Sequence, residues 1–168
     1  MNDTMTIFDY LYSKYKITKP IRLIEFFAGY GSQALALKYL GVSFEHWKIC
    51  EWAVKSIQAY KDIHFTDDNT DYSSGISKQQ IIERLNYFGI SSNYNEPMTL
   101  EQIARLKENQ LRIIFNNIVA THNLVNIQKV KGDDLEISDT DKYDYVLTYS
   151  FPCQDLSLRS SRKRQRNE

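Results

Sequence analysis

The chain has 168 residues, of which 42% are apolar and 25% charged, proportions that are ordinary for one globular domain. Lys plus Arg and Asp plus Glu number 21 each, so net charge gives no argument for a nucleic-acid partner. The two cysteines, Cys50 and Cys153, have neither disulfide-rich nor zinc-ligand spacing, and we expect no metal site. Without a signal peptide or a run of roughly 18 apolar residues, the sequence predicts a cytoplasmic protein with no membrane contact.

The first third of the chain alternates between strand and helix patterns. Residues 1–20 are polar and aromatic and are expected to form an N-terminal extension that Pro20 closes. The elements predicted next are a strand at Ile21–Phe26, a glycine turn, a helix at Gln33–Leu40, a strand at Val42–Cys50 and a helix at Trp52–Tyr60.

The rest of the chain contains more helix. A polar loop at residues 61–75 precedes a helix predicted at Ser77–Phe88. Thr99 and Gln102 have the spacing of a capping box, which predicts one long helix after Thr99. Strands are predicted at Val125–Val130 and Tyr143–Tyr149. This alternation favours an α/β fold with a mostly parallel sheet flanked by helices.

Four short motifs follow predicted strands, where ligands bind in open α/β sheets. The first is Phe27-Ala28-Gly29-Tyr30-Gly31-Ser32. Its glycines permit a sharp turn and close approach of a ligand, and the amides at the following helix start favour a polar or anionic group. A simple helix-entry turn is the alternative interpretation.

The second motif, Glu51-Trp52, lies about 20 residues beyond the glycines, where an acidic residue commonly accepts hydrogen bonds from ribose hydroxyls. Trp52 offers a flat face to an adenine. The alternatives are a glutamate that stabilises a helix dipole and a core tryptophan. The third motif, Gly132-Asp133-Asp134, supplies a carboxylate for an adenine amino group or is only a solvated acidic turn.

The fourth motif is Pro152-Cys153, which follows the last predicted strand. A helix beginning near Gln154 would favour the thiolate of Cys153, the nucleophilic form of the side chain. A buried cysteine is more often a small apolar residue, and we interpret Cys50 as such a core residue.

In this order the four motifs resemble the opening motifs of the DNA cytosine-C5 methyltransferases. The resemblance runs from about Ile21 to Leu158, and the segment SFPCQDLS at residues 150–157 is its most specific part. It implies a partial, doubly wound Rossmann-like methyltransferase fold at residues 21–158. Residues 62–126 would be a helical insertion, and residues 159–168 a basic disordered tail.

The resemblance also implies a chemistry. S-adenosyl-L-methionine would lie across the strand ends. Its contacts would come from Phe27, Ala28, Gly29, Gly31, Ser32, Glu51, Trp52, Asp133, Asp134 and Pro152. Cys153 would add to C6 of a cytosine flipped out of double-stranded DNA, which activates C5 for methyl transfer.

The family's later motifs have no counterpart in the sequence, including the glutamate that assists attack and the target-recognition domain. We therefore expect a truncated chain with little or no activity of its own. One choice of codons for the segment SRKRQRNE at residues 161–168 is AGC AGG AAA AGG CAA AGG AAT GAN. Shifted by one base, these codons encode the loop Ala-Gly-Lys-Gly-Lys-Gly-Met that the family has after Leu-Ser. Three explanations remain for the basic end of the sequence and the missing motifs. They are a frameshift, a basic arm for phosphate contacts, and one half of a split enzyme that a second chain completes. A non-catalytic module that binds S-adenosylmethionine or nucleic acid is the alternative function.

Overall fold

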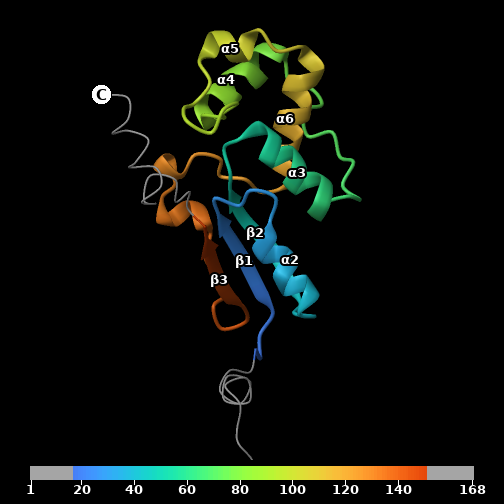
Figure 1. Cartoon of the computed structure of the whole chain (residues 1–168), viewed down its shortest axis with the longest axis vertical. Helices are drawn as coiled ribbons and strands as arrows, with labels where there is room; N and C mark the ends of the chain where they lie inside the picture. The colour runs from blue at the N-terminus through green and yellow to red at the C-terminus, as the bar shows by residue number, and fades with distance from the viewer. Residues whose placement is uncertain (1–16, 151–168) are drawn as a thin grey trace, which may run out of the picture.

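The structure is a computed structural model, and it describes residues 17–150 (Figure 1). Three strands, five α-helices and two short 3-10 helices are found in this range. They are β1 (Ile21–Phe26), α2 (Ser32–Tyr39), β2 (Phe44–Cys50), α3 (Val54–His64), α4 (Lys78–Phe88), α5 (Leu100–Ala104), α6 (Glu108–Ala120), η1 (Ile127–Lys129), η2 (Gly132–Leu135) and β3 (Asp144–Tyr149). Pro152 and Cys153 lie outside the described residues.

The strands form a parallel sheet in the order β2-β1-β3. β1 is central, and its Leu23 and Glu25 point to the same face because side chains alternate along a strand. Tyr60 of α3 and the start of α2 contact Glu25, so these two helices cover that face. A parallel sheet flanked by helices confirms the predicted fold class, in the partial, Rossmann-like form that the motifs implied.

The remaining helices lie together beyond the carboxyl ends of the strands, with α3 between them and the sheet (Figure 1). α6 packs against α3 and α4, and α4 packs against α5. The larger of two apolar clusters joins these helices and includes Ile57, Ile81, Leu85, Ile103 and Leu111, each at most 1% exposed. The helical segment therefore has an apolar core of its own next to the strand ends.

Local signals located most elements correctly. Ser77 caps α4, and Thr99 and Gln102 form the predicted capping box at the start of α5. The single long helix predicted after Thr99 is wrong, because Lys107 adopts an extended conformation and separates α5 from α6. The Gln110 side chain accepts the Lys107 backbone N–H at 3.0 Å, and this hydrogen bond stabilises the break.

The strand predicted at Val125–Val130 is also wrong. Only Asn123 forms a bridge to β2, opposite Ile49, and the Leu124 N–H donates to the Ile49 carbonyl at 2.8 Å. Val125 then turns the chain with a φ of 61°, in the left-handed region, which ends the extended run. The segment continues as η1 and η2 rather than as part of the sheet.

Candidate functional site

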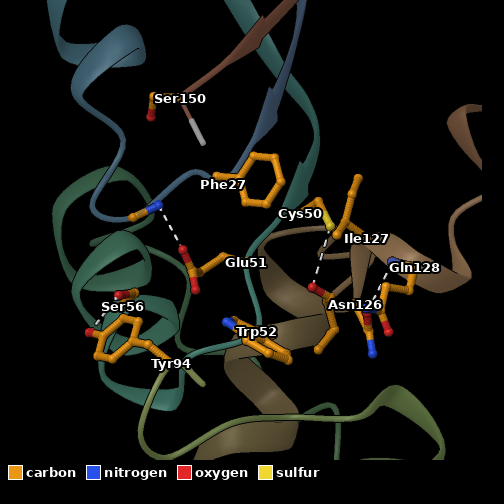
Figure 2. A pocket seen from close by; sticks show the side chains of 12 residues that line it. Phe27, Cys50, Glu51, Trp52, Ser56, Tyr94, Asn126, Ile127, Gln128 and Ser150 are labelled. Atoms are coloured by element: carbon orange, nitrogen blue, oxygen red, sulfur yellow. Dashed lines mark hydrogen bonds between the residues drawn. The ribbon is translucent and has the colours of Figure 1, made fainter. Parts of the chain in front are cut away.

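A pocket of about 400 Å³ opens at the carboxyl ends of β1, β2 and β3. This volume is in the range of small-molecule sites. The residues that line it come from the strand ends, α3, the loop after α4 and the segment around η1 (Figure 2). They are Phe27, Gly29, Cys50, Glu51, Trp52, Ser56, Tyr94, Val125, Asn126, Ile127, Gln128 and Ser150.

The glycine turn after β1 forms one wall of the pocket. Phe27 and Gly29 have φ angles of 55° and 56°, so the chain reverses within three residues. The turn is tied to β2 because the Ala28 N–H donates to the Cys50 carbonyl at 3.3 Å. It places the Phe27 ring and the Gly29 backbone at the pocket, while Ala28 is buried beneath at 4% exposure.

Glu51, directly after β2, connects the ends of β1 and β2 at the floor of the pocket. Its carboxylate accepts the Gly29 N–H at 2.9 Å on Oε2 and the Ala53 N–H at 2.8 Å on Oε1. Burial raises the pKa of this carboxyl, and the backbone hydrogen bonds partly oppose the shift. Each carboxylate oxygen has a further lone pair, so Glu51 can also accept hydrogen bonds from a ligand's hydroxyl groups.

Asn123 holds the Glu51 backbone in place. Its Oδ1 accepts the Glu51 N–H at 3.1 Å, and its Nδ2 donates to the Glu51 carbonyl at 2.9 Å. The same Oδ1 accepts the Val125 N–H at 2.8 Å, which fixes the start of the opposite wall. One buried amide therefore sets the spacing between Glu51 and the segment that follows Val125.

That opposite wall is built on Val125 and the 3-10 turn η1. The Val125 carbonyl accepts a hydrogen bond from the Cys50 thiol at 3.3 Å. Burial raises the pKa of Cys50 to about 12, so this thiol stays protonated at neutral pH. The prediction that Cys50 is a core residue agrees with its 2% exposure.

Beneath the glycine turn lies a buried polar network on the covered face of the sheet. The Tyr60 hydroxyl donates to Glu25 Oε2 at 2.5 Å, and Glu25 Oε1 accepts the Ala34 N–H at 3.1 Å. Since the one hydroxyl proton of Tyr60 points to Glu25, His46 Nδ1 donates to the Tyr60 oxygen at 2.8 Å. Burial lowers the pKa of His46 to about 4 and thereby favours the neutral ring.

The structure brings four of the predicted contact residues together at the pocket, namely Phe27, Gly29, Glu51 and Trp52. Gly31 is the N-cap of α2 and Ser32 its first residue, and a Cβ on Gly31 would meet Tyr60 and His64 rather than the pocket. Asp133 and Asp134 lie exposed in η2 and are not among the described residues that line the pocket.

Within the described residues, neither a metal site nor a membrane-spanning helix is found. No group of three His, Cys, Asp or Glu side chains within residues 17–150 is placed to hold a metal. Within the same range, no helix has the length and apolar content needed to cross a bilayer.

The chain is similar to a known methyltransferase. No protein-family model matches the chain. Over 147 residues the chain is 34% identical to the orphan methyltransferase M.SssI of Spiroplasma monobiae, and the match covers 87% of the chain. The match confirms the resemblance to the DNA cytosine-C5 methyltransferase family. The chain spans 37% of the length of M.SssI, so it corresponds to only a part of that protein.

Sequence motifs account for only one side of the pocket. Ser56, Tyr94, Asn126 and Gln128 also line it, and none of them lies in a recognised motif. Asn123 was missed as well, although its amide organises the site. The amide-rich segment around Asn123 and Asn126 was the available signal, but nothing in the sequence indicated its partner 72 residues earlier.

Proposed function

We propose that this chain is the methyl-donor-binding part of a DNA cytosine-C5 methyltransferase and that its pocket binds S-adenosyl-L-methionine. The observation that carries the proposal is the joint placement of Glu51, Trp52 and Phe27 around one cavity at the strand ends. The relationship to M.SssI supplies the reaction class, because that protein is a methyltransferase.

The residues present fit such a donor. Phe27, Trp52 and Ile127 offer apolar surface for a planar base. Glu51 is held with its carboxylate at the pocket and can accept from ribose hydroxyls. S-adenosylmethionine, when bound, supplies an electrophilic methyl group attached to sulfur.

We propose roles for the chain's residues in the complete reaction. Glu51 would orient the donor through its ribose, and Trp52 and Phe27 would exclude water from the base. Cys153, outside the described residues, would attack C6 of a flipped cytosine in double-stranded DNA. Pro152, also outside the described residues, stays a predicted donor contact. For Ala28, Gly31, Ser32, Asp133 and Asp134, donor contacts stay predictions, and the geometry supports a structural role for Ala28 and Gly31.

Isothermal titration calorimetry with S-adenosyl-L-homocysteine, the product of methyl donation, tests the proposal. We expect binding by the wild-type chain and at least tenfold weaker binding by Glu51→Gln and Trp52→Ala. Glu83→Gln is the matched control, because Glu83 is exposed on α4 and is not among the described residues that line the pocket. Absence of binding by the wild-type chain, or equal loss in the control, would overturn the proposed function.

A second measurement concerns the nucleophile. A duplex that contains 5-fluorocytosine is expected to form a covalent adduct with a complete site, and Cys153→Ser is expected to abolish it. Donor binding without an adduct would support donor binding alone and favour the non-catalytic module as the function of this chain.

A further inference from the structure

The loop after α4 is attached to the segment that follows Glu51. The Ser91 N–H donates to the Trp52 carbonyl at 2.7 Å, and the Val54 N–H donates to the Ser91 carbonyl at 2.9 Å. These bonds bracket Ala53, which forms an isolated parallel bridge with Ser91. The loop therefore has a fixed position relative to Trp52 and to the start of α3.

The loop is also held from within. The buried Ser91 hydroxyl donates to the Glu96 carbonyl at 2.7 Å and accepts the Tyr94 N–H at 3.1 Å. Asn93 Oδ1 accepts the Asn95 N–H at 3.0 Å. Tyr94 has a φ of 66°, in the left-handed region that non-glycine residues rarely adopt. Strain of this kind persists where the surrounding contacts determine the conformation, and it is concentrated at ligand sites.

This conformation places the Tyr94 side chain at the pocket. Its hydroxyl lies 3.0 Å from the Ser56 hydroxyl of α3, and both residues line the cavity. Figure 2 shows Tyr94 and Ser56 on the side of Glu51, with Ile127 and Gln128 across the pocket. Tyr94 is 55% exposed, so its ring presents surface that a bound molecule can cover.

We infer that Tyr94 and Ser56 form the ribose side of the donor pocket, beside Glu51, and contribute to selection of a ribonucleoside. The inference rests on the proposed function. Two paired hydroxyl groups share one hydrogen bond, which leaves one hydroxyl proton to donate to a ribose oxygen. The Tyr94 ring covers the sugar from outside. A segment without a recognised motif thus completes a pocket that the motifs only half describe.

Calorimetry with S-adenosyl-L-homocysteine provides the first test. We expect Tyr94→Ala to weaken binding about tenfold, which corresponds to about 1.4 kcal/mol, and Tyr94→Phe to weaken it less because the ring remains. Tyr39→Ala, a matched change at a tyrosine that is 86% exposed on α2, is expected to leave affinity unchanged. Thermal melts of all variants identify any that fail to fold.

The 2′-deoxy analogue of S-adenosyl-L-homocysteine tests the hydroxyl pair. Wild-type chain is expected to prefer the ribose form, and Tyr94→Phe and Ser56→Ala are each expected to reduce that preference. If the wild-type chain binds the ribose form and neither Tyr94 variant changes affinity or preference, the inference is wrong while the proposed function stands. If the wild-type chain does not bind, both are overturned.

Discussion

Replacing Gly31 by alanine is expected to destabilise the fold because two independent terms act at this position. Gly31 has a φ of +81°, a conformation in which a Cβ is disfavoured by about 1–2 kcal/mol. An added Cβ would also lie 2.7 Å from Tyr60 Cε2 and closer still to His64 Nε2. Overpacking of this kind costs about 1–3 kcal/mol. Together the terms predict a loss of about 2–5 kcal/mol in the free energy of unfolding.

Gly41 provides the matched control. Its φ is +70°, close to that of Gly31, but nothing lies within 4 Å of an added Cβ. Gly41→Ala should therefore show the backbone term alone, about 1–2 kcal/mol. The difference between the two variants isolates the steric contact with Tyr60 and His64.

Urea unfolding followed by tryptophan fluorescence measures both variants, since the chain has two tryptophans, Trp47 and Trp52. We expect Gly31→Ala to lose at least 1 kcal/mol more than Gly41→Ala. Equal losses would show that α3 does not approach the glycine turn as closely as the structure indicates, and the reasoning would fail.

Three further predictions concern other parts of the structure. The pKa of His46 is lowered from 6.5 to about 4 in the folded chain, so between these pH values the unfolded chain binds more protons than the folded chain. The free energy of unfolding should therefore fall as pH falls through this window. His46→Phe should flatten the dependence in pH-resolved thermal melts, whereas an unchanged slope would contradict the role of His46. Asn123→Ala should lower the free energy of unfolding by about 2–4 kcal/mol and weaken donor binding, since it strips buried backbone groups at Glu51 of their partners. An unchanged donor affinity of Asn123→Ala in calorimetry would contradict this prediction. Leu147 is 50% exposed on the edge strand β3, so the chain should self-associate, and Leu147→Lys should shift it towards monomer in size-exclusion chromatography. A wild-type chain that already elutes as a sharp monomer peak would refute this expectation.

Sequence reasoning worked where the determinants of structure are local. β1, the glycine turn and α2 follow one another within 20 residues, and apolar spacing with turn glycines is sufficient to locate them. The capping box predicted at Thr99 acts over three residues, and the structure forms it. Glu51 and Trp52 line the pocket, as predicted, because they follow a strand and the carboxyl ends of parallel strands meet at one edge of the sheet.

The strand predicted at Val125–Val130 is wrong because distant contacts decide the conformation there. The sequence VNIQKV at residues 125–130 has the apolar content of a strand, but Asn123 binds the Glu51 backbone and Val125 takes a left-handed conformation. No local pattern carries this information, because the partner, Glu51, lies 72 residues earlier. The error at Lys107 is different, because the hydrogen bond that accompanies the break is to Gln110, only three residues later.

The same distinction explains the composition of the pocket. Phe27, Tyr94 and Val125 all line it and all have positive φ angles, although none is glycine. Such conformations cost about 1–3 kcal/mol each and persist only when surrounding hydrogen bonds impose them. Ser91 imposes the turn at Tyr94, and Asn123 accepts the Val125 N–H. The pocket is therefore set before any ligand arrives, and its shape depends as much on these two buried side chains as on the glycine turn from which the sequence predicted it.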